Sequence, residues 1–175
     1  GVVSAPGRGS TFWFVVEFAA PRESVRPDPA TTFGGVRILV VDDNPTSRKA
    51  LFQLLKSWNA DADCVENPAA AIIALNAAAN AKNTFPIVLL DNDSPSNHAL
   101  QFAASVSQNP VLGRPSVVLM GSAPESPFTA NFFEYGIAAY ETKPVPASRL
   151  QTVLRKILGR SLQSPPSPPS PSSTP

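Results

Sequence analysis

The sequence has 175 residues, of which 43% are apolar and 15% charged, with a formal net charge of +1. This length suits one domain of ordinary size with additional segments. The apolar content is enough for a buried core, which excludes a chain that is disordered throughout. A near-neutral charge argues against nucleic-acid binding, because nucleic-acid-binding proteins gather phosphates with an excess of positive charge.

No apolar run approaches the roughly 18 residues of a membrane span, so we expect no membrane contact by this chain and a cytoplasmic location. Any membrane anchor of a parent protein would lie outside this sequence. Cys64 is the single cysteine, so it cannot form an internal disulfide, and we expect it to be a buried thiol.

The N-terminal part predicts one strand and a linker. Residues 10–18 are aromatic and β-branched, which is typical of a strand, and a turn-forming segment at 6–9 precedes them. No partner strand is expected nearby. Residues 21–35 are rich in Pro, Asp, Thr and Gly without an apolar period, which is typical of a linker, so the main domain is expected to begin at residue 36.

From residue 36, short apolar runs alternate with amphipathic ones, which predicts strands alternating with helices. Asn44 is a suitable N-cap for the first helix, with Pro45 at its first position, and Leu55 and Trp58 fall on its apolar face. The strands are expected at 36–41, 62–65, 85–90, 116–120 and 137–140, and the helices at 45–58, 68–79, 97–107, 128–135 and 146–158.

This order predicts an α/β fold with a doubly wound, five-stranded parallel sheet and helices on both faces. In such folds the functional site lies at the carboxyl ends of the strands. The rule brings Asp42, Asp43, Asp91, residues 121–122 and Lys143 to one edge of the sheet.

The C-terminal part contains a helix and a tail. The last helix carries four basic residues, Arg149, Arg155, Lys156 and Arg160. The simplest interpretation is a solvated face, although such a face can also bind a partner. Residues 161–175 are rich in Pro and Ser and nearly free of apolar side chains, so we expect a disordered tail.

The acidic edge predicts a metal site. Three carboxylates at neighbouring strand ends repel one another, by about 4 kcal/mol per pair at 4 Å with an effective dielectric near 20. A small hard cation such as Mg²⁺ relieves this repulsion. A metal-shielded Asp91 could then act as a nucleophile toward a phosphoryl group, with Lys143 as a fixed positive charge.

Three segments include the charged residues of this edge: Ile38–Asn44, Val88–Asp91 with Pro95 four residues later, and Tyr140–Pro144. These segments closely resemble the signature segments of response-regulator receiver domains. The resemblance covers roughly residues 36–158 and implies the flavodoxin-like receiver fold. It also implies a phosphorelay function in two-component signalling, with a histidine kinase or a histidine phosphotransfer domain as partner.

The resemblance assigns a role to each residue of the acidic edge. It implies that Asp91 is the phosphoacceptor and that Lys143 binds the phosphate. It implies that Mg²⁺ is bound by Asp43 directly, by Asp42 mainly through water, by Asp91, and by the backbone carbonyl of Asp93.

One position departs from the receiver pattern. Tyr140 matches the aromatic switch residue of receivers, which responds to a Thr or Ser hydroxyl at the end of the fourth strand. Counting back from Lys143 gives Gly121 at that position, and Ser122 is the alternative source of a hydroxyl. Counting forward from Pro115 gives Met120 instead. Without this hydroxyl, phosphoryl transfer could persist while the conformational response is weakened.

The segment Gly7–Phe14 resembles the closing glycine box and final strand of histidine-kinase ATP-binding domains. It implies that residues 1–20 are the end of such a domain, that 21–35 are a linker, that 36–160 are the receiver, and that the parent protein is a hybrid histidine kinase. This chain lacks the rest of the ATP site and the phosphorylatable histidine. Its only histidine, His98, is expected to be a surface residue.

Two other functions fit parts of the sequence. A degenerate receiver could keep the fold and act only as a docking surface for proteins, which Gly121 favours and the intact acidic residues oppose. The segment Asp91-Asn92-Asp93 also mimics the Asp-x-Asp motif of haloacid-dehalogenase-like phosphatases. In those enzymes, however, the motif lies on the first strand.

Overall fold

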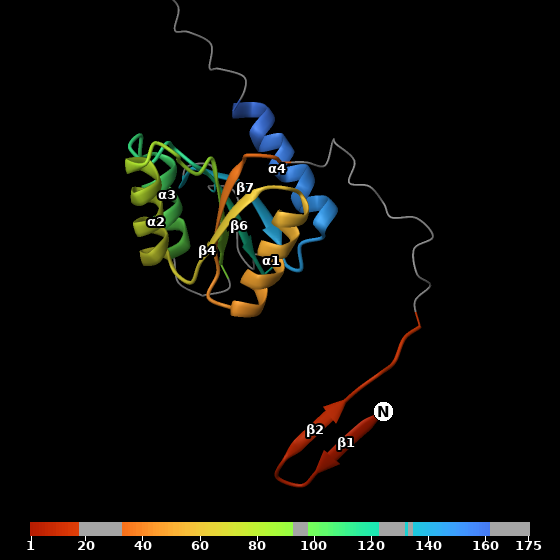
Figure 1. The fold of residues 1–175 in the computed structure, drawn as a ribbon. Helices are drawn as coiled ribbons and strands as arrows, with labels where there is room; N and C mark the ends of the chain where they lie inside the picture. The colour runs from red at the N-terminus through yellow and green to blue at the C-terminus, as the bar shows by residue number, and fades with distance from the viewer. Residues whose placement is uncertain (18–32, 93–97, 123–131, 133–134, 162–175) are drawn as a thin grey trace, which may run out of the picture.

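The computed structural model describes residues 1–17, 33–92, 98–122, 132 and 135–161 (Figure 1). Its strands are β1 (Val2–Ala5), β2 (Gly9–Phe12), β3 (Arg37–Val41), β4 (Asp61–Val65), β5 (Ile87–Asp91), β6 (Ser116–Gly121) and β7 (Ile137–Thr142). Its helices are α1 (Pro45–Ser57), α2 (Pro68–Asn80), α3 (His98–Ser107) and α4 (Ala147–Ser161). The helix expected at 128–135 falls almost wholly outside the described residues.

Strands β3 to β7 form a five-stranded sheet in the order β4-β3-β5-β6-β7, with every neighbouring pair parallel. Helices α1 and α4 cover one face and α2 and α3 cover the other, as Figure 1 shows. The central strands are buried on both faces, because each crossover helix places apolar side chains over the sheet. The doubly wound parallel sheet expected from the sequence is confirmed.

The expectation of a single N-terminal strand at residues 10–18 was wrong. Strands β1 and β2 form an antiparallel hairpin in which Val2 pairs with Phe12 and Ala5 with Gly9. The turn between them uses Gly7 and Gly9 at φ of 74° and 80°, a conformation that favours glycine. Strand β2 ends at Phe12, and residues 13–17 continue without regular secondary structure.

The packed part of the domain begins at Phe33, inside the segment assigned to the linker from the sequence. Phe33 is only 4% exposed. Its ring lies 5.7 Å from that of Trp58, and its amide donates to the Trp58 carbonyl. Leu55 is fully buried and Trp58 is half-buried, as expected for the apolar face of α1, whereas Cys64 is only partly buried at the edge of the same core.

The described helices include none with the length and apolar character that crossing a membrane requires.

Candidate functional site

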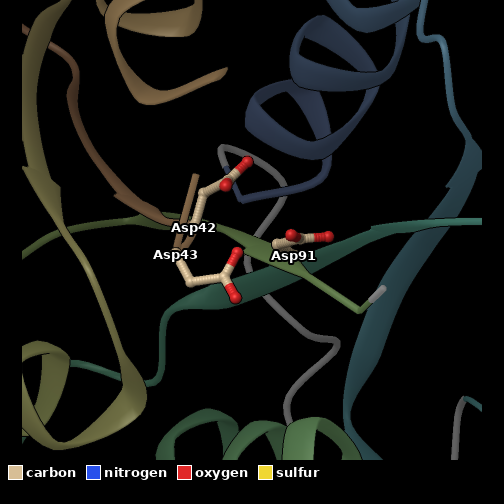
Figure 2. Close-up of side chains that lie close together, drawn as sticks. All are labelled: Asp42, Asp43 and Asp91. Atoms are coloured by element: carbon tan, nitrogen blue, oxygen red, sulfur yellow. The ribbon is translucent and has the colours of Figure 1, made fainter. Parts of the chain in front are cut away.

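Three aspartates meet at the carboxyl edge of the sheet. Asp42 and Asp43 follow β3, and Asp91 is the last residue of β5. One carboxylate oxygen from each lies within 4.8 Å of the others, and Figure 2 shows the three side chains grouped at this edge. Asp42 is buried, Asp43 is exposed and Asp91 lies between these extremes. The spacing is small enough for one cation to contact all three side chains.

Asp42 is the buried aspartate of the cluster. Its Oδ1 accepts a hydrogen bond of 2.8 Å from the Asn44 amide, whereas its buried Oδ2 has no hydrogen-bond partner among the described residues. Burial raises the pKa of this carboxyl, and the negative charge of Asp91 raises it further, although the Asn44 amide opposes the change. A buried acceptor without a donor costs free energy, so the oxygen is suited to a cation.

Lys143 provides the positive charge of the site. Its Nζ lies 2.6 Å from Asp91 Oδ1 and 3.9 Å from Asp42 Oδ2. The lysine follows β7 directly, and its amide donates to the Gly121 carbonyl at 2.9 Å. The loop after β7 is thereby joined to the end of β6, and the ammonium group faces the cluster.

The residues that follow Asp42 and Asp43 determine where α1 begins. The Asn44 side chain accepts hydrogen bonds from the amides of Thr46 and Ser47, and Pro45 occupies the first turn. This is the N-cap predicted from the sequence. Arg48, one turn later, donates to the Asp42 carbonyl at 2.7 Å. The cap and the arginine together fix the backbone that carries Asp42.

The end of β6 contains Gly121, which pairs with Thr142 of β7, whereas Met120 is buried in the core and pairs with Asp91. A Cβ atom added to Gly121 would lie 3.2 Å from the Tyr140 hydroxyl oxygen and 3.2 Å from the Asn92 carbonyl oxygen. The tyrosine hydroxyl therefore lies close to the place where a larger residue at position 121 would put its side chain.

Tyr140 is held from two sides. Its hydroxyl donates to the Ser122 carbonyl, and its ring stacks on Phe132 with centroids 5.2 Å apart and planes 14° apart. Ser122 itself is exposed. The contact recorded between the two residues thus uses the serine backbone.

Most of the residues expected at the site do meet there: Asp42, Asp43, Asp91, Gly121, Tyr140 and Lys143. Asp93 lies outside the described residues, and the side chain of His98, at the start of α3, is also not described. The sequence reasoning overlooked Glu141, a buried carboxylate two residues before Lys143 that accepts hydrogen bonds from Arg149. A charged residue within an otherwise apolar strand was the available signal.

A family model and two curated proteins show sequence similarity to this chain. Residues 38–155 match the family described as "Response regulator receiver domain". Sensor histidine kinase AruS of Pseudomonas aeruginosa is 26% identical over 159 residues, which cover 90% of this chain and 15% of the relative. Sensor protein GacS of Pseudomonas syringae is 29% identical over 155 residues, which cover 85% of this chain and 16% of the relative. This chain therefore spans only a small part of these curated relatives.

Solved structures agree with the fold. A response regulator receiver domain protein from Clostridium thermocellum matches with a TM-score of 0.62 at 16% identity, covering 73% of this chain and 97% of that protein. The chemotaxis response regulator CheY4 of Vibrio cholerae matches with a TM-score of 0.57 at 16% identity, covering 70% of this chain and 98% of that protein.

Proposed function

This chain belongs to the family of response regulator receiver domains of two-component signalling, and we propose that Asp91 is the side chain that accepts the phosphoryl group. An Asp91 oxygen attacks the phosphorus of a phosphohistidine, a P–O bond forms as the P–N bond breaks, and the leaving imidazole keeps the electron pair of the broken bond. The phosphodonor would be a histidine kinase or a histidine phosphotransfer domain.

The observation that carries this proposal is the arrangement of three carboxylates within 4.8 Å of one another with a lysine ammonium 2.6 Å from Asp91. Phosphoryl transfer needs an oxygen nucleophile and positive charge around the transferred oxygens. Asp91 and Lys143 have these properties, and Lys143 can move from the carboxylate to a phosphoryl oxygen without leaving the site.

The same residues fit Mg²⁺. Carboxylate oxygens are its preferred protein ligands, and Asp42 Oδ2 is a buried acceptor without a donor among the described residues. We propose that Asp43 and Asp91 bind the cation directly and that Asp42 does so mainly through water, with the Asp93 carbonyl as a further ligand. When bound, Mg²⁺ neutralises charge on the transferred oxygens.

The test is a titration with beryllofluoride, a phosphoryl mimic, in the presence of Mg²⁺, followed by amide NMR. Wild type should bind with the largest shifts at the carboxyl edge, and Asp91→Asn should not bind. Asp61→Asn is the matched control, because this exposed aspartate is the first residue of β4 and so lies at the amino ends of the strands, away from the acidic edge. Equal binding by Asp91→Asn would refute the assignment. If wild type binds no beryllofluoride, a docking function without phosphorylation is favoured.

A second proposal concerns the N-terminal hairpin, which we infer to be the end of a histidine-kinase ATP-binding domain in a hybrid kinase. The match to AruS covers 90% of this chain, more than residues 38–175 could contain, so it extends to the N-terminal side of the receiver domain. Phe12 and Phe14 are 79% and 86% exposed, which is unusual for aromatic residues unless another surface covers them.

The hairpin proposal can be tested by exchange of segments. Residues 1–20 should replace the corresponding segment of a sensor histidine kinase with retention of ATP-dependent autophosphorylation. The same segment with Phe12→Ser and Phe14→Ser should abolish that activity while the kinase still folds by circular dichroism. Loss of activity with the unaltered segment would contradict the proposal. Because the donor kinase uses ATP, we also propose that this domain works in the cytoplasm.

A further inference from the structure

Among the described residues, two charged side chains are buried, and one of them lies outside the acidic cluster. These residues are Asp42 and Glu141, which are 1% and 6% exposed. Both carboxylate oxygens of Glu141 accept hydrogen bonds from Nε of Arg149, at 3.1 and 2.9 Å. This pair raises the pKa of the arginine, and it gives the buried carboxylate the partner that its burial requires.

Neither the position of Glu141 in its strand nor the position of Arg149 in its helix favours a charged residue by itself. Glu141 lies on the side of β7 that carries Ala139, which packs against the core beneath α1 and α4, so an apolar residue would be the ordinary choice. Arg149 lies in the first turn of α4, which has no acidic residue. A positive charge is unfavourable there, because the helix dipole places partial positive charge at the same end. The two residues therefore make sense as a pair.

The pair spans the segment that contains Lys143. Glu141 lies on β7 and Arg149 lies eight residues later on α4. Leu150, the next residue, is fully buried and anchors the helix. Between these two points the Lys143 amide donates to the Gly121 carbonyl. The loop is thus attached to β6 at its first residue, and the strand before it and the helix after it are joined by Glu141 and Arg149.

We propose that Glu141 and Arg149 position the phosphate-binding lysine by holding both ends of its loop. This inference rests on the proposed function for its consequence, since Lys143 is useful only if its ammonium group meets a phosphoryl group at Asp91. A side chain that must bridge to a small anion depends on a fixed backbone, and a displacement of about 1 Å can cost about 100-fold in such a site. Glu141 and Arg149 contact neither phosphate nor metal and act through the loop.

The experiment separates positioning from stability with three variants of the full chain. Arg149→Met keeps the aliphatic stem and removes the ion pair. The double variant Glu141→Leu with Arg149→Leu removes both charges, so the buried position of Glu141 becomes apolar and no unpaired carboxylate is left there. Arg155→Met is the control, because Arg155 is an exposed arginine further along α4. The readouts are the hydrogen-exchange rate of the Lys143 amide and the affinities for Mg²⁺ alone and for beryllofluoride with Mg²⁺.

We expect the Lys143 amide to exchange at least about 10-fold faster in Arg149→Met and in the double variant, with beryllofluoride affinity lowered by about 10-fold and Mg²⁺ affinity unchanged. Arg155→Met should match wild type. If the double variant is as stable as wild type and its Lys143 amide exchanges at the wild-type rate, the pair is only structural and the inference is wrong. A wild type that binds no beryllofluoride would refute the function of Asp91, while the exchange rates would still decide the role of the pair.

Discussion

Replacing Asp43 by Asn should stabilise the metal-free protein. The Asp43 carboxylate lies within 4.8 Å of those of Asp42 and Asp91. At that distance each like-charge pair costs about 3.5 kcal/mol at an effective dielectric of 20 and about 0.9 kcal/mol in water. Asp43 is exposed and Lys143 offsets part of the repulsion, so the lower value is the better guide. We expect the free energy of unfolding to rise by about 1 kcal/mol.

In the presence of Mg²⁺, wild type should instead be more stable than Asp43→Asn. A ligand that binds only the folded state stabilises it by about 1.4 kcal/mol at ten times its Kd, and wild type should gain this amount while Asp43→Asn gains less. The assay is urea unfolding in EDTA and in Mg²⁺, with Asp61→Asn as a control that should gain as much stability from Mg²⁺ as wild type does. If Asp43→Asn is less stable than wild type in EDTA, the three carboxylates do not repel one another as the geometry requires.

Lys143→Met should abolish beryllofluoride binding by removing the ammonium beside Asp91, whereas Lys156→Met, on an exposed part of α4, should bind as wild type does; NMR titration distinguishes them. Cys64 should react slowly with iodoacetamide at pH 8, because burial, followed by the charge of Asp63, raises the pKa of the thiol, and a rate equal to that of an unstructured peptide would contradict this. That preference for the neutral thiol also means that stability should fall as the pH rises above the ordinary thiol pKa of about 8.5. Gly121→Thr should displace the Tyr140 hydroxyl, which lies 3.2 Å from the new Cβ, and unchanged ring shifts in the NMR spectrum would refute the close contact.

The sheet and its acidic edge could be predicted because their signals are local. Asp42, Asp43 and Asp91 each stand directly after or at the end of an apolar run, and parallel strands bring such positions to one edge. The hairpin was harder to predict because all four residues of β1 are exposed, so no alternation of buried and exposed positions marks the strand. Its pairing depends on a turn rather than on a core.

Contacts between residues far apart in the sequence explain the other features that the sequence did not predict. Phe33 follows a polar segment and precedes two glycines, so nothing in the adjacent sequence indicates that it packs on Trp58, 25 residues later. Glutamate is usually a surface residue, so the sequence does not indicate that Glu141 is buried. Only the packing of α4 beside β7 brings its partner Arg149 close to it. The position of the Tyr140 hydroxyl beside Gly121 likewise depends on side-chain geometry that spacing does not encode.

The contact of Phe33 with Trp58 also determines where the chain enters the domain. Phe33 precedes β3 and binds the C-terminal end of α1, so it lies at the amino end of the strands. Helix α4 starts after β7 and runs back along the sheet, so Ser161 lies toward that same end. The first and last described residues of the packed domain, Phe33 and Ser161, therefore lie on the side of the sheet away from Asp91.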